Sequence, residues 1–114
     1  MRIRNQIEVT PEAAPMAGAR GAFIQWLVAG PEGAENFFMR RIIIEEGGLV
    51  PEHEHPEEHE IYVLTGQGRV EAGEASRALE PGDCVFIPGG ERHGFTNTGP
   101  GQLTFICCIN VVKA

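Results

Sequence analysis

The chain has 114 residues, enough for one domain with a hydrophobic core and too few for two. Sixteen acidic residues against nine lysines and arginines give a net charge of -7 at pH 7, which argues against nucleic-acid partners and anionic membranes. The N-terminal residues lack the continuous apolar run of a signal peptide, and no stretch approaches membrane-spanning length, so we expect a cytoplasmic protein.

Residues 1–20 are rich in Ala, Pro and Gly, which predicts an extended N-terminal arm, with the folded domain over 21–114. From Ala22 onward, short apolar runs alternate with Gly and Pro breaks at roughly ten-residue spacing, which is typical of a β-sandwich or barrel. Helical periodicity is lacking, so we predict an all-β protein with almost no helix. The predicted strands are 23–28, 37–45, 60–65, 68–72, 77–79, 84–87, 94–97 and 103–111.

The period of two along a strand predicts which side chains face the interior. In the last strand the odd-numbered row is apolar, so Cys107 should face inward. In the strand over 37–45 the even-numbered row is the better inward row, which would place Arg40 among apolar neighbours, where a charge needs a partner or a ligand. An exposed Arg40 with Arg41 inward is an equally good interpretation.

Three cysteines, Cys84, Cys107 and Cys108, occur without any Cys-x-x-Cys spacing. Because adjacent strand residues point to opposite faces, Cys107 and Cys108 should not serve one site. We therefore expect buried free thiols and neither a disulfide framework nor a zinc ribbon.

The four histidines of the chain fall into two short patterns, and imidazole is the commonest metal-binding side chain in its neutral form. His53 and His55 are two residues apart, so a strand would present both rings on one face. His59 can return to the same ion across Pro56, and His93 can arrive from a later strand. The spacing therefore predicts a metal site built from His53, His55, His59 and His93.

The glycines and prolines around these histidines sit at fixed intervals. The first pattern is Gly47-(x5)-His53-x-His55-(x3)-His59-(x6)-Gly66, and the second is Gly82-(x5)-Pro88-x-Gly90-(x2)-His93-(x3)-Asn97. Together they resemble the two motifs of a single-domain cupin. Most cupins carry glutamate where this chain has His59. Glu60 is an alternative ligand, but it would put the closing glycine one residue out of place.

The resemblance is greatest to the small four-histidine, manganese-binding monocupins. It implies a cupin jelly-roll β-barrel with a metal inside one mouth, and Gly47-Gly48 permitting a turn before the His53 strand. It favours Mn as the divalent metal, with Fe second, and an all-nitrogen ligand set is also compatible with Ni, Cu or Zn.

Three functions fit such a site. The first is a metal-dependent oxygenase of small molecules, and the others are a metal-dependent lyase or isomerase and a non-enzymatic small-molecule-binding module. The expected substrate pocket consists of Arg40, Phe95, Phe105, Cys107 and Ile109. Exposed sheet edges and an apolar outer face predict a homodimer.

Overall fold

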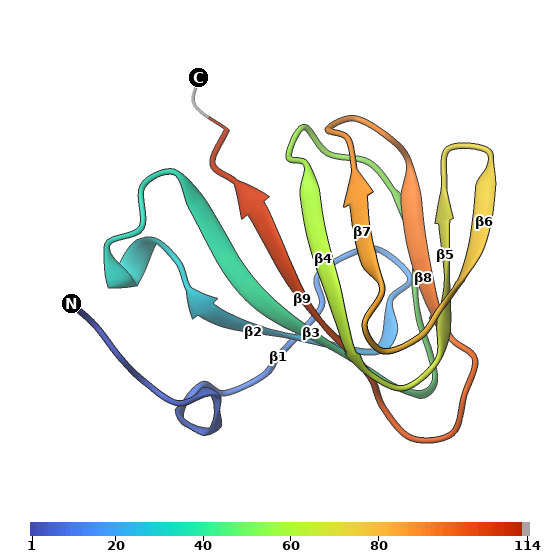
Figure 1. Ribbon diagram of the computed structural model, residues 1–114, viewed down its shortest axis with the longest axis horizontal. Coiled ribbons are helices and arrows are strands. Elements are labelled where there is room, and N and C mark those ends of the chain that lie inside the picture. Colours follow the sequence, from blue (N-terminus) through green and yellow to red (C-terminus); the bar gives the residue numbers. More distant parts are fainter. Residues whose placement is uncertain (113–114) are drawn as a thin grey trace.

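The computed structural model describes residues 1–112, and these residues form an almost entirely β-stranded protein (Figure 1). Its two 3-10 helices are three residues long, and none of the described helices is long and apolar enough to cross a membrane. The elements in chain order are η1 (Gln6–Glu8), β1 (Glu12–Ala13), β2 (Arg20–Val28), η2 (Gly30–Glu32), β3 (Phe37–His53), β4 (His59–Thr65), β5 (Gly68–Ala72), β6 (Ala75–Leu79), β7 (Cys84–Ile87), β8 (His93–Asn97) and β9 (Leu103–Asn110).

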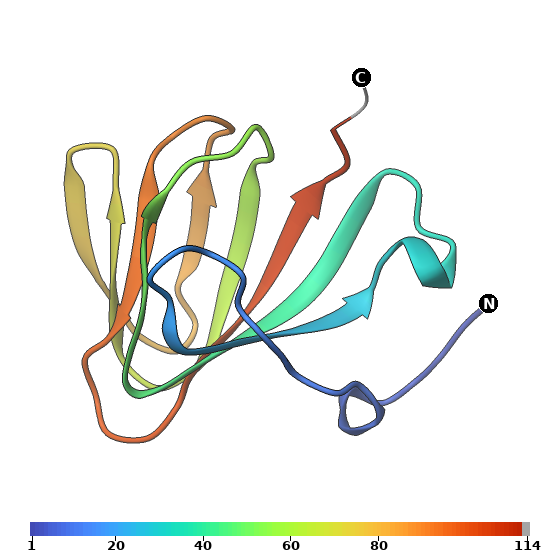
Figure 2. The same ribbon diagram turned by 180° about the vertical axis from the view of Figure 1, so that it is seen from behind.

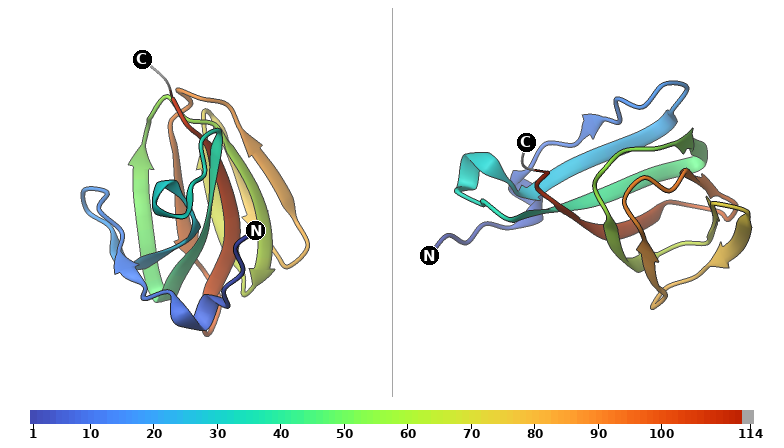
Figure 3. Two further views of the ribbon diagram at one scale, coloured as in Figure 1. Left: turned by 90° about the vertical axis from the view of Figure 1, so that its left-hand side faces the viewer. Right: turned by 90° about the horizontal axis from the view of Figure 1, so that it is seen from above.

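The strands pair antiparallel in the order β6-β5-β8-β3-β9-β4-β7, and β2 also pairs with β3. Right-handed twist curls this sheet around a common interior, as the view from above in Figure 3 shows. The all-β jelly-roll prediction is therefore confirmed. The predicted strands agree with the structure because all but one of the predicted Gly and Pro breaks lie between two strands.

The exception is Gly47-Gly48, where the sequence predicted a strand end and the structure has a continuous strand. β3 runs for 17 residues through both glycines, so the predicted break after Glu45 is wrong. Its register against β2 jumps from Ala22↔Ile44 to Arg20↔Leu49, which marks a β-bulge. A side chain at Gly48 would place Cβ 2.8 Å from the Arg20 carbonyl oxygen. The glycines thus bend β3, so that its second half pairs with β8.

The hydrophobic core lies inside the curled sheet and is built from the inward rows of the strands. The even-numbered row of β3 faces this interior, with Ile42 and Ile44 buried and Arg40 only 8% exposed. On β9 the odd-numbered row is buried, including Phe105 and Cys107. Arg40 therefore lies among apolar side chains, and the alternative of an exposed Arg40 is wrong.

The N-terminal segment lies against its own chain (Figure 2). β1 pairs with β2 through Glu12↔Ile24, and the Gln25 side-chain amide donates to the carbonyl oxygens of Gln6 and Val9. Beyond β1, Met16 packs on the core. The segment predicted as an arm is therefore tied to the sheet that carries the histidines.

Candidate metal centre

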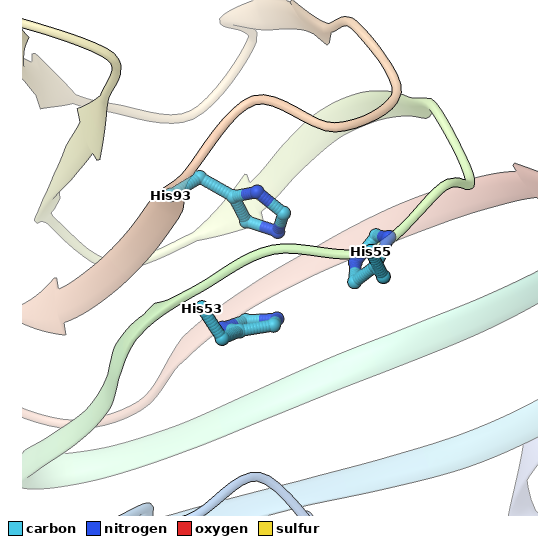
Figure 4. Close-up of side chains that lie close together, drawn as sticks. All are labelled: His53, His55 and His93. Carbon is cyan, nitrogen blue, oxygen red and sulfur yellow. The ribbon is translucent and has the colours of Figure 1, made fainter.

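The four histidines meet at one mouth of the curled sheet (Figure 4 shows three of them). His53 ends β3 and pairs directly with His93 at the start of β8, and His55 follows β3. His59 begins β4. The ring centroids of neighbouring histidines are 4.5–5.4 Å apart. Strand register thus brings together all four residues that the sequence predicted.

Three of these imidazoles are oriented by the backbone. The Nδ1 atoms of His53, His55 and His93 lie 3.0, 3.1 and 2.8 Å from the carbonyl oxygens of Pro51, Glu57 and Glu91. A carbonyl oxygen only accepts, so each Nδ1 carries the proton and each Nε2 presents a lone pair. This is the tautomer in which histidine binds a metal through Nε2.

Within residues 1–112, the Nε2 atoms have no hydrogen-bond partners outside the histidine cluster. His93 Nε2 is buried without a hydrogen bond, and His55 Nε2 lies 2.8 Å from His59 Nε2. Two nitrogens bound at right angles to an ion about 2.0–2.1 Å away would be separated by about 2.9 Å. A ligand atom from each of His53, His55 and His93 lies within 4.8 Å of the other two. The donor set therefore fits a single divalent metal ion.

The structure places His59, and not Glu60, in this cluster. His59 is 2% exposed and its ring faces those of His55 and His93. Glu60 is the next residue on β4, so it points to the opposite face, where it is exposed. The period of two along β4 explains why one position, and not its neighbour, is available to an ion inside the barrel.

Burial favours the neutral form of three of the imidazoles. Burial lowers the pKa of His93 to about 4. Burial, with a further contribution from the nearby Arg40 charge, lowers the pKa of His59 to about 2. Burial also lowers the pKa of His55, although Glu57 opposes this effect. At neutral pH these three rings are uncharged, with one nitrogen free of a proton, and they are therefore competent to bind a metal.

A cavity of about 10 Å³ lies beside the histidines, large enough for about one water molecule. Four predicted pocket residues line it, namely Arg40, Phe95, Phe105 and Cys107. Ile109 is buried in the core and does not line the cavity. His53, His59 and His93 also line it, and the remaining wall comes from Met16, Ile42 and Val50, which were not predicted. The even-row alternation of β3 could have identified Ile42, but no local pattern identifies Met16.

Arg40 brings a buried positive charge to this cavity. Its guanidinium stacks 5.6 Å from the centre of the Trp26 ring, and its Nη2 lies 3.4 Å from His59 Nδ1. Its Nε is buried without a hydrogen-bond partner. Across residues 1–112, the ion pairs of the structure do not include Arg40. The side of the site away from solvent is therefore electropositive before any metal binds.

Comparison with known protein families identifies the family of this chain. Residues 40–109 match the family model described as Cupin_2, a cupin domain. The chain belongs to this cupin family. Its matched region contains all four histidines of this cupin, together with Arg40 and Cys107.

Individual cupins resemble this one over most of its length. The oxalate-binding protein of Thermotoga maritima is 31% identical over 106 residues, which cover 90% of this chain and 88% of the relative. The polyketide cyclase RemF from Streptomyces resistomycificus has a structure that matches with a TM-score of 0.90 at 29% identity, covering 96% of this chain and 79% of RemF. A predicted oxalate decarboxylase from Thermotoga maritima matches with a TM-score of 0.85 at 26% identity, covering 97% and 100% of the two chains.

Proposed function

We propose that this cupin binds one divalent metal ion through Nε2 of His53, His55, His59 and His93. The observation that carries the proposal is the convergence of the four histidine rings. In three of them the Nδ1 contact with a backbone carbonyl leaves a lone pair on Nε2. Mn is the first choice of metal and Fe the second, with Ni, Cu and Zn also compatible with nitrogen ligands.

We further propose that the ligand of this centre is a small anion with oxygen donors. Four neutral imidazoles cancel none of the ion's charge, and Arg40 adds a buried cation whose Nε lacks a partner. The cavity of about 10 Å³ holds about one water molecule, so it excludes a bulky ligand from the space beside Arg40. The similarity to an oxalate-binding protein supports the same chemical class.

Metal-dependent oxygenation is the reaction that we propose for this ligand. A bound ion of this kind would supply Lewis-acid activation and open coordination positions. Phe95, Phe105 and Ile42 give the cavity an apolar wall, and Arg40 would stabilise negative charge on the ligand. Among the residues that the structure describes, the side chains lining the cavity include no carboxylate that could act as a general base.

A lyase reaction is the second candidate, because a structural relative is described as a predicted oxalate decarboxylase. Such a reaction would need no oxygen consumption, although it would need a proton donor. A binding module without turnover is the third candidate, supported by the name of the oxalate-binding relative.

The test uses the protein loaded with Mn or Fe and a panel of small oxygen-chelating acids, with oxalate as the first probe. We expect oxygen uptake that requires both metal and acid and that falls at least tenfold in Arg40→Met. If NMR shows that product forms under nitrogen, without oxygen uptake, the oxygenase proposal is wrong and the lyase proposal takes its place. Tight calorimetric binding with neither reaction would leave the binding module.

We also propose a homodimer formed through the outer face of β4 and the edge strand β7. This face exposes Tyr62, Leu64 and Phe86, the last with 60% of its surface accessible, so a second copy would bury an apolar patch. Sedimentation velocity at micromolar concentration is expected to give a dimer for the parent and a monomer for Phe86→Glu. A monomeric parent would contradict the proposal.

A further inference from the structure

His59 differs from the other three histidines in the partner of its Nδ1 atom. The other Nδ1 atoms face backbone carbonyls, whereas His59 Nδ1 faces the Cys107 sulfur at 2.7 Å and Arg40 Nη2 at 3.4 Å. A guanidinium can only donate a hydrogen bond. Of these two neighbours, only the sulfur can therefore accept a proton from Nδ1.

Strand register creates this contact. On the β4·β9 pair, His59 lies opposite Ile109 and Ile61 opposite Cys107, so His59 and Cys107 are diagonal neighbours on the inward face. On the β3·β9 pair, Arg40 lies directly opposite Cys107. Cys107 thus stands between the guanidinium and the imidazole, and it is 1% exposed.

The sulfur can accept hydrogen bonds while it remains a thiol. Its S–H can donate to the Cys108 carbonyl oxygen, which lies 3.9 Å from the sulfur. Arg40 Nη2 donates to the sulfur from 3.7 Å. In that orientation of the thiol, the lone pairs of the sulfur are available to the guanidinium and the His59 ring.

The two tautomers of His59 have opposite consequences for a metal. With the proton on Nε2, His59 donates to His55 Nε2 at 2.8 Å, and neither of these two nitrogens has a lone pair free for an ion. With the proton on Nδ1, Nε2 presents a lone pair to the cluster. Arg40 favours the first tautomer because it donates to an unprotonated Nδ1, and Cys107 favours the second.

We infer that Cys107 is a positioning residue for the metal centre: its sulfur accepts the Nδ1 proton of His59 and so holds His59 in the metal-binding tautomer. The inference rests on the proposed four-histidine site and adds to it the residue that prepares the fourth ligand. Such outer-shell partners orient a ligand ring and typically change metal affinity by 10- to 100-fold when they are removed.

The first test is the dissociation constant of Mn, measured by chelator competition in the parent, Cys107→Val, Cys107→Ser and Cys108→Val. Valine fills the space without an acceptor, and we expect it to weaken binding about 10- to 100-fold. Serine restores an acceptor and should bind within about threefold of the parent. Cys108→Val changes the neighbouring thiol, whose side chain points away from the barrel interior, and should leave affinity unchanged.

Equal affinities of the parent and Cys107→Val would overturn the inference while leaving the metal site intact. A parent that binds no metal would instead overturn the proposed function, and this inference with it. If Cys107→Val fails to fold, the metal-free parent alone decides the question through nitrogen NMR of its histidines at neutral pH. A proton on His59 Nδ1 before any metal is added supports the inference, and a proton on Nε2 overturns it.

Discussion

The double variant His53→Ala/His93→Ala is expected to retain less than a tenth of the metal found in the parent when both are purified without an affinity histidine tag. The two residues face each other across β3 and β8, so their loss removes half of the proposed ligand set from one side of the site. His93 Nε2, buried without a partner in the structure, is the strongest single reason for this expectation. Elemental analysis of Mn, Fe, Ni, Cu and Zn is the measurement.

Arg92→Gln is the matched control, because Arg92 precedes His93 but is exposed and pairs with Glu52. It should keep the parental metal content. The single variants His59→Ala and Glu60→Ala then test the register of the ligands, with metal lost from the first and kept in the second. Full metal content in His59→Ala would instead point to a ligand set without His59.

The metal-free protein is expected to lose stability as the pH falls from 7 to 5. Burial lowers the pKa of His93 to about 4 and that of His59 to about 2, whereas both should titrate near 6.5 in the unfolded chain. Below pH 6.5 the unfolded state therefore binds protons that the folded state does not, so the free energy of unfolding decreases. Each group contributes roughly 1.4 kcal/mol per pH unit, or about 4 kcal/mol for both between pH 6.5 and 5.

Urea denaturation at intervals across this range is the measurement, and the loss is a large part of the roughly 5–15 kcal/mol that stabilises a typical domain. His93→Gln is the control variant, since glutamine does not titrate. On unfolding, this variant should take up about one proton fewer than the parent, so its stability should depend less steeply on pH. Bound metal should keep the histidines uncharged and oppose acid unfolding until the ion is released. An identical slope in the parent and in His93→Gln would show that the burial of His93 does not govern acid stability.

The sequence was sufficient to predict the strands and the histidine cluster, because both depend on short intervals. The interval to the closing glycine, Gly66, favoured His59 over Glu60 without knowledge of any distant contact. The bulge at Gly47-Gly48 was misread because a glycine pair serves equally well for a turn or for a bend within a strand. Only the pairing partners of β3 distinguish the two.

Contacts between distant segments were not predictable from the sequence in the same way. The approach of His59 to Cys107 depends on the register of β4 against β9, which alternation alone leaves open by steps of two residues. The position of Met16 in the cavity wall depends on how the N-terminal segment folds back over β2. Neither contact has a local sequence signal.

Met16 lies outside the region matched by the family, residues 40–109, yet it forms part of the cavity wall beside the histidines. The four histidines and this part of the cavity wall therefore belong to segments whose sequences can change independently. A substitution in the N-terminal segment can reshape the space offered to a ligand while every metal-binding nitrogen stays in place. Selectivity for the proposed ligand and retention of the proposed metal are therefore separable targets for engineering in this protein.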